Sequence, residues 1–128
     1  MRTIIAGSRT FTDYDELVLA VHSAPFVPTL IISGTANGVD KLGERYANEN
    51  KIPLEKHPAM WKDEKGIYHK NAGYLRNVQM AEVADALIAL WDGESFGTKH
   101  MIDIARKKGL LLHIVTVDPR TNILKYSF

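Results

Sequence analysis

Five short apolar runs, separated by stretches with helical spacing, constrain the fold of this chain more than any other feature. The runs are Thr3–Ala6, Leu30–Ser33, Leu54–His57, Ala86–Leu90 and Leu110–Val115. Three of them carry adjacent β-branched residues without polar alternation, which is typical of strands covered on both faces. We therefore expect five strands in a mainly parallel sheet.

Four amphipathic stretches alternate with these strands and are expected to be helices. They begin near Asp13, Val39, Asn71 and Gly97, and the last ends before Gly109, a suitable C-cap. The expected inward residues are Leu17, Val18, Val21, Val39, Leu42, Tyr46, Leu75, Val78, Ala81, Met101, Ile104 and Ala105. The alternation predicts an α/β fold, a Rossmann-like three-layer domain over residues 1–128 with right-handed crossovers. Ile123–Tyr126 could add an edge strand or pair with another subunit.

Composition excludes several classes of function. The 128 residues include no cysteine, so disulfides, thiolate metal sites and a cysteine nucleophile are excluded. No histidine pair has the spacing of a zinc site, and we expect no metal. No apolar run approaches the roughly 20 residues of a membrane span, so we expect no membrane partner and a cytoplasmic location. The formal net charge of +1 indicates no broad nucleic-acid surface, so we expect no nucleic-acid partner.

Small and polar residues fill three of the expected strand-to-helix junctions. Carboxyl ends of parallel strands meet at one edge of the sheet, where glycines admit a ligand and helix N-termini attract anions. An arginine there can grip phosphate through two bonds. Turn chemistry alone is the alternative at each single junction. The expected ligand-binding residues are Gly7, Ser8 and Arg9, then Ser33, Gly34, Thr35, Asn37 and Gly38, then Asp92, Gly93, Ser95, Gly97 and Thr98.

Three further residues carry two interpretations each. Arg76 could reach a phosphate and Asn77 a base or sugar, or both could lie on an ordinary solvated helix face. Asp40 could cap its helix or bind a ribose hydroxyl. The segment Pro58–Lys70, which carries Trp61, is expected to be an irregular loop, either a lid or a solvated connection.

In their order along the chain, these motifs resemble the SLOG superfamily, most closely its YspA-like, cpYpsA-related branch. The matching features are Gly7-Ser8-Arg9, Ser33–Asp40, the helix start Gly73–Met80 and Trp91–Thr98. The resemblance extends to about Val115. It implies a Rossmann-like fold that binds a nucleotide or nucleotide-derived ligand, and self-association of the kind that small relatives commonly show.

Related branches include phosphoribohydrolases of the LOG type, whose motif is P-G-G-x-G-T-x-x-E. Gly97-Thr98 match its G-T and Arg76 resembles its catalytic arginine, but Met101 stands where the glutamate is expected. Methionine cannot transfer a proton. We therefore expect a binding protein for an ADP-ribose- or NAD-type signal, with no required cofactor and no assigned catalytic residue. An N-glycosidic hydrolase using Asp92, Glu94 or Asp40 is the alternative.

Overall fold

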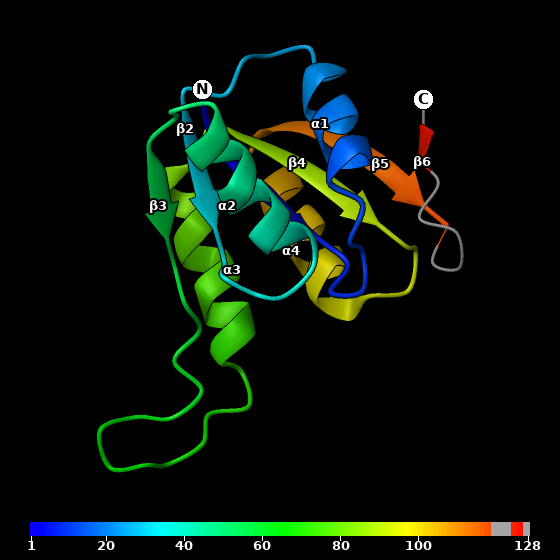
Figure 1. Cartoon of the computed structure of the whole chain (residues 1–128). Helices are drawn as coiled ribbons and strands as arrows, with labels where there is room; N and C mark the ends of the chain where they lie inside the picture. Colours follow the sequence, from blue (N-terminus) through cyan, green and yellow to red (C-terminus); the bar gives the residue numbers. More distant parts are fainter. Residues whose placement is uncertain (119–123, 127–128) are drawn as a thin grey trace.

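The chain forms a six-stranded sheet with four helices in the computed structural model, which describes residues 1–118 and 124–126. The strands are β1 (Arg2–Gly7), β2 (Leu30–Ser33), β3 (Leu54–Lys56), β4 (Ala86–Trp91), β5 (Leu111–Val117) and β6 (Leu124–Tyr126). The helices are α1 (Tyr14–His22), α2 (Val39–Glu49), α3 (Ala72–Val83) and α4 (Phe96–Lys107). Strands and helices alternate along the chain as the apolar runs predict (Figure 1).

The sheet has the order β3-β2-β1-β4-β5-β6, and its first five strands are parallel. The strand β6 pairs antiparallel with β5, which confirms the extra edge strand; Ile123 lies outside the described residues. From β1 the chain first builds outward through β2 and β3 and then returns to add β4 on the other side. The carboxyl ends of β1 and β4 therefore form the topological switch point, where open α/β sheets bind ligands.

Two apolar cores lie on opposite faces of the sheet and confirm the three-layer arrangement. On one face Ile5, Ile31 and Ile88 pack with α1 and α2. On the other face their neighbours Ile4 and Leu87 pack with α3 and α4. Because successive strand residues point to opposite faces, adjacent β-branched pairs supply one residue to each core.

Most helix starts and buried faces follow the sequence prediction. Asp13 caps α1, since its Oδ1 accepts a bond of 3.2 Å from the backbone N–H of Glu16. One expectation is wrong: Leu75 is 54% exposed instead of facing the core. Met80 is buried in its place and Ala81 is buried as predicted, because α3 turns the face that carries Asn77 toward the sheet and α4.

A hairpin-like arm connects β3 to α3 and projects from the body of the molecule (Figure 1). We define the arm as residues Pro58–Lys70. Lys62 and Tyr68 form an antiparallel bridge, and His69 N–H donates to Trp61 O at 2.7 Å. At the tip, Asp63 Oδ1 accepts bonds of 2.9 Å from the backbone of Lys65 and Ile67. The expected irregular loop is thus an ordered hairpin.

Candidate functional site

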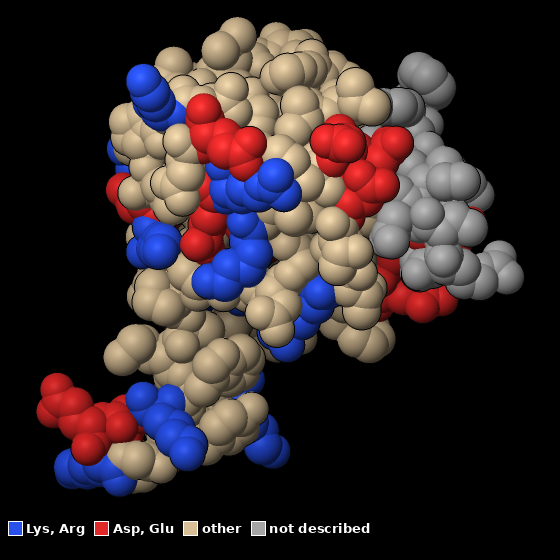
Figure 2. All heavy atoms as spheres, viewed as in Figure 1, with Lys and Arg blue, Asp and Glu red and all other residues tan. Residues whose placement is uncertain are grey.

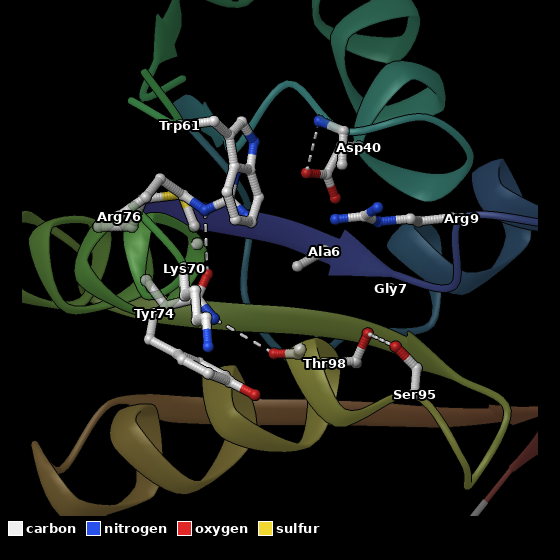
Figure 3. A pocket seen from close by; sticks show the side chains of 15 residues that line it. Ala6, Gly7, Arg9, Asp40, Trp61, Lys70, Tyr74, Arg76, Ser95 and Thr98 are labelled. Carbon is white, nitrogen blue, oxygen red and sulfur yellow. Dashed lines mark hydrogen bonds between the residues drawn. The ribbon is translucent and has the colours of Figure 1, made fainter. Parts of the chain in front are cut away.

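A cavity of about 230 Å³ opens at the switch point between β1 and β4. We call it the first cavity. It is lined from β1, α2, the arm, α3 and the start of α4, segments that lie far apart in the sequence (Figure 3). Eight of the sequence-predicted site residues line it, namely Gly7, Arg9, Asp40, Arg76, Asn77, Ser95, Gly97 and Thr98.

A second cavity of about 260 Å³ adjoins the first and takes up three more of the predicted residues. Gly34, Thr35 and Asn37 line this second cavity, together with Pro58 and Ala59 of the arm. Four residues line both cavities: Arg9, Ala36, Trp61 and Arg76. The turn after β2 therefore contributes mainly to a compartment of its own.

The remaining five predicted residues line neither cavity; they are Ser8, Ser33, Gly38, Asp92 and Gly93. Buried Ser33 accepts a bond of 3.0 Å from Thr35 N–H and donates one of 2.7 Å to Glu44. Gly38 caps α2 with φ +77°, and a Cβ there would lie 2.2 Å from Ser8 O, so only glycine fits. These contacts shape the turns around the two cavities.

Asp92 orders the turn between β4 and α4. Its Oδ1 accepts bonds of 2.8 Å from the backbone N–H groups of Glu94 and Ser95. Partial burial opposes ionisation, but these donors outweigh it and hold the pKa of Asp92 below its usual value. Gly93 follows with φ +84°, and the hydroxyl of buried Ser8 also contributes to lowering the pKa of Asp92.

Two arginines face the first cavity from opposite sides (Figure 3). Arg76 donates from Nε to Asn77 Oδ1 at 3.1 Å and from Nη1 to Gly34 O. Burial lowers the pKa of Arg76, although a guanidinium stays charged in proteins. Arg9 makes no hydrogen bond or ion pair within the described part of the chain. The interpretation of Arg76 as an ordinary solvated arginine is therefore wrong.

Asp40 is the acidic residue that lines the first cavity. Its Oδ2 accepts a bond of 3.1 Å from Ala36 N–H, which ties α2 to the turn after β2. Burial raises the pKa of Asp40 from 3.8 to about 6, against the lowering effects of that bond and of Arg76. Near neutral pH the cavity thus combines two guanidiniums with one carboxylate whose charge is costly to keep.

Asn77 links α3 to α4 instead of pointing a free amide at a ligand. Its Oδ1 accepts from Arg76, and its Nδ2 lies 3.2 Å from Gly97 O and 3.1 Å from His100 Nδ1. Burial lowers the pKa of His100, which favours the neutral ring that can accept at Nδ1. Asn77 positions Arg76, and the expected contact with a base or sugar is not supported by this bonding.

Aromatic and basic residues complete the first cavity, and the sequence reasoning missed most of them. Trp61 lies above the cavity and Tyr74 on the opposite side, where its ring meets the His100 ring edge-on at 4.5 Å (Figure 3). Lys70 lines the same cavity and has no ion pair among the described residues. The signal available for Tyr74 was its place two residues before Arg76, within the Gly73–Met80 motif.

Of the three candidate acid/base residues, Asp40 lines the first cavity, whereas Asp92 and Glu94 do not. Glu94 is exposed, and Asp92 accepts backbone hydrogen bonds within its own turn. Met101 is 1% exposed and packs in the core against the sheet. Asp40 is thus the one candidate that faces the cavity.

A larger hollow of about 630 Å³ lies between the arm and α3. Exposed apolar side chains form much of it, among them Met60, Ile67 and Leu75. It is built from residues 58–79 alone, and Arg76 is the one predicted site residue among those that line it. The chemistry expected for a phosphate-bearing ligand is therefore concentrated in the two smaller cavities.

Residues 1–118 and 124–126 contain neither a cluster of metal ligands nor a membrane-spanning helix. No group of three or more histidine, aspartate or glutamate side chains comes together there as metal ligands. No helix in this part of the chain has the length and apolar character needed to cross a bilayer.

Sequence comparison assigns the family. The model of the YspA, cpYpsA-related SLOG family matches residues 1–63, which run from β1 into the arm. The gene 61 protein of Mycobacterium phage D29 is 34% identical over 119 residues, covering 85% of this chain and 91% of that protein. This chain belongs to the YspA, cpYpsA-related SLOG family. The resemblance read from the junction motifs is confirmed.

Solved structures share the fold of this family member at low sequence identity. DNA processing protein A from Streptococcus pneumoniae superposes with a TM-score of 0.70 at 14% identity, over 88% of this chain. DNA processing protein A from Helicobacter pylori gives a TM-score of 0.61 at 19% identity, again over 88%. The chain spans 49% and 64% of those two proteins, respectively.

The expectation of no nucleic-acid partner is wrong. The Helicobacter pylori structure concerns the single-stranded DNA binding mode of that protein, so the same fold occurs in a nucleic-acid-binding protein. The expectation relied on net charge, and net charge says nothing about how cations are grouped. Figure 2 shows acidic and basic side chains interspersed on one face and on the arm, whereas Arg9 and Arg76 converge inside the first cavity.

Proposed function

We propose that this chain binds a nucleotide-type ligand in the first cavity, with a phosphate held by Arg9 and Arg76. The observation that carries the proposal is the convergence of these two guanidiniums on one cavity, where Arg9 makes no hydrogen bond or ion pair within the described residues. The two cations repel one another; Asp40 offsets part of that repulsion, and a phosphate between the guanidiniums would add two charge-assisted contacts. Family membership supports a nucleotide-related ligand.

The other lining groups suit the remaining parts of a nucleotide. Ser95 and Thr98 bring hydroxyls from the start of α4, whose free N–H groups favour an anion. Asp40 can accept a bond from a ribose hydroxyl, and Trp61 and Tyr74 offer ring faces or edges to a base. Each chemical part of a nucleotide therefore has a matching side chain in the cavity.

Calorimetry tests this proposal with a panel of AMP, NAD, ADP-ribose and cyclic nucleotides. At least one should bind more tightly than about millimolar. Adenosine, which lacks the phosphate, is the matched control and should bind much more weakly than AMP. Failure of the whole panel, or equal binding of adenosine and AMP, would contradict the proposal.

Single-stranded nucleic acid is a second candidate ligand, favoured by the arm. Trp61 and Tyr68 stack with ring centroids 6.0 Å apart and planes at 11°, and both remain exposed. Lysines flank this pair at positions 62, 65 and 70, and aromatic platforms beside basic side chains are typical of single-strand binding. Fluorescence anisotropy with labelled oligothymidine at low salt would test it. Binding that Trp61→Ala leaves unchanged would argue against this use of the arm.

The hydrolase alternative depends on Asp40, whose pKa of about 6 suits proton transfer near neutral pH. Chromatography of AMP incubated with the protein would detect free base. Release of base that disappears in Asp40→Asn would favour catalysis, whereas unchanged AMP would leave binding as the function.

A further inference from the structure

The first and second cavities adjoin one another and share four lining residues. Arg9, Trp61 and Arg76 belong to both cavities, together with Ala36. Neither cavity, at about 230 and 260 Å³, reaches the range of about 300–1,000 Å³ that ligand pockets usually occupy. The combined volume of the two cavities falls within that range. A ligand of ordinary size would therefore extend through both.

Two of the three positively charged residues that line the cavities, Arg9 and Arg76 but not Lys70, lie at the junction of the two cavities. Arg9 and Arg76 are the only charged residues among the described residues that line the second cavity, and both are shared with the first. A phosphate placed between them would lie at the boundary, with room for one group on each side. The distribution of charge therefore favours a bridging phosphate over a terminal one.

The turn after β2 offers the second cavity neutral groups instead of a phosphate loop. The N–H of Thr35 is bonded to Ser33 Oγ at 3.0 Å, and the N–H of Ala36 to Asp40 Oδ2 at 3.1 Å. These amides are thus not available to an anion. The Thr35 hydroxyl and the Asn37 amide remain, beside the apolar Pro58 and Ala59 of the arm.

We propose that the ligand has two uncharged, base- or sugar-sized ends joined through phosphate, with one end in each cavity and the bridge against Arg9 and Arg76. This inference rests on the proposed nucleotide binding and narrows it to two-ended ligands. Trp61 lines both compartments, so its indole separates the two ends and can contact each of them. Two kinds of molecule have two such ends joined through phosphate: a free dinucleotide-type molecule, and two neighbouring nucleotides within a nucleic-acid strand.

The experiment compares AMP with two-ended ligands by calorimetry on the full chain. ADP-ribose supplies a diphosphate bridge and the dinucleotide ApA a single phosphodiester. Burial of a second neutral end should make at least one of them bind about tenfold or more tightly than AMP. The better of the two identifies the kind of bridge, and hence whether a free signal or a strand is the source.

Ala59 provides the variant that addresses the second cavity alone. It is half-buried on the arm and lines the second cavity but not the first. Ala59→Leu fills that space and should remove the tenfold advantage of the two-ended ligand over AMP, measured as the ratio of the two Kd values in the same variant. Ala59→Ser, which keeps the side chain small, is the matched control and should behave as the wild type.

Each outcome separates this inference from the proposed function. Equal affinity for AMP and both two-ended ligands, or an advantage that survives Ala59→Leu, overturns the two-ended ligand and leaves nucleotide binding intact. Absence of binding for AMP, ADP-ribose and ApA together overturns both.

Discussion

Arg76 on α3 donates a hydrogen bond to the backbone carbonyl oxygen of Gly34, although 42 residues separate them in the sequence. The contact joins the helix after the arm to the turn after β2, at the boundary between the two cavities. A Cβ at position 34 would lie 2.6 Å from Arg76 Nη1, so the glycine makes room for the guanidinium. The arginine is thus held in place before any ligand arrives.

Replacing Arg9 should weaken ligand binding with little effect on folding. Arg9→Ala removes an exposed guanidinium that makes no hydrogen bond or ion pair within the described residues and has the smallest of the charge effects on Asp40, so stability should change by less than about 0.5 kcal/mol. Loss of charge-assisted bonds to phosphate should cost about 1.5–3 kcal/mol, or roughly 10- to 150-fold in Kd. Calorimetry and thermal unfolding measure the two effects. Arg106→Ala, an exposed arginine on α4, is the control; equal Kd values in both variants would remove Arg9 from the site.

Asp40 should make the protein less stable as the pH rises from about 4 to 6. The folded protein holds this proton up to a pKa of about 6, whereas the unfolded chain releases it near 3.8. The folded state therefore binds more protons in this window, and its contribution to stability is lost as the pH rises through the folded pKa. The raise corresponds to about 3 kcal/mol.

Denaturant unfolding of the wild type and Asp40→Asn at several pH values would measure that contribution. Asparagine keeps an oxygen for Ala36 N–H but does not titrate, so the free-energy difference between the two proteins should vary between pH 4 and 6. Other carboxylates with lowered pKa values, such as Asp63 and Asp103, act in the opposite direction and cancel in the difference. A difference that is independent of pH would show that Asp40 titrates normally.

Gly38 should tolerate no side chain. In Gly38→Ala the Cβ would meet the backbone of Ser8 and Arg9 at 2.2–2.6 Å, at a φ of +77°. Gly109→Ala shares that φ but has open space around its Cβ, so it should cost only the conformational penalty of about 1–2 kcal/mol. The crowded site should cost a further 1–3 kcal/mol or so. Similar unfolding midpoints for the two variants would contradict the close approach of the two turns.

Asn77 should control the protonation of His100. Asn77→Asp would place a carboxylate about where the amide now lies, 3.1 Å from His100 Nδ1, and should raise the pKa of His100. Titration followed by NMR measures this directly. Asn48→Asp, on the exposed surface of α2, is the matched control and should leave His100 unaffected. An unshifted His100 in Asn77→Asp would mean that the link between α3 and α4 is absent.

The indole ring of Trp61 should contribute to nucleotide binding. Trp61→Ala should weaken nucleotide binding by about 1–3 kcal/mol, the range found for base stacking on aromatic side chains, and Trp61→Phe should retain most of the affinity. Trp91, the other tryptophan, donates to Ser95 O and does not line the first cavity. Trp91→Phe should therefore bind normally and leave Trp61 as the single tryptophan, which can be excited selectively over the tyrosines. Unchanged fluorescence on binding would exclude contact with Trp61.

The sequence by itself determined the layers of this protein. Adjacent residues such as Ile4 and Ile5 pack in two different cores, because a strand points successive side chains to opposite faces. Only a sheet covered on both faces needs apolar residues at successive positions. The junction after β1 and the start of α4 could also be placed at the ligand edge, since parallel strands end at the same side. These features depend on local order along the chain.

Only the tertiary structure decided which side chains meet. Leu75 has helical spacing but is exposed, while Arg76 beside it reaches Gly34, because the rotation of α3 is set by its packing against α4 and the sheet. The proton affinity of Asp40 depends on burial by distant segments, which no local pattern records. The division of one predicted site into two cavities likewise follows from the arm placing Trp61 between them.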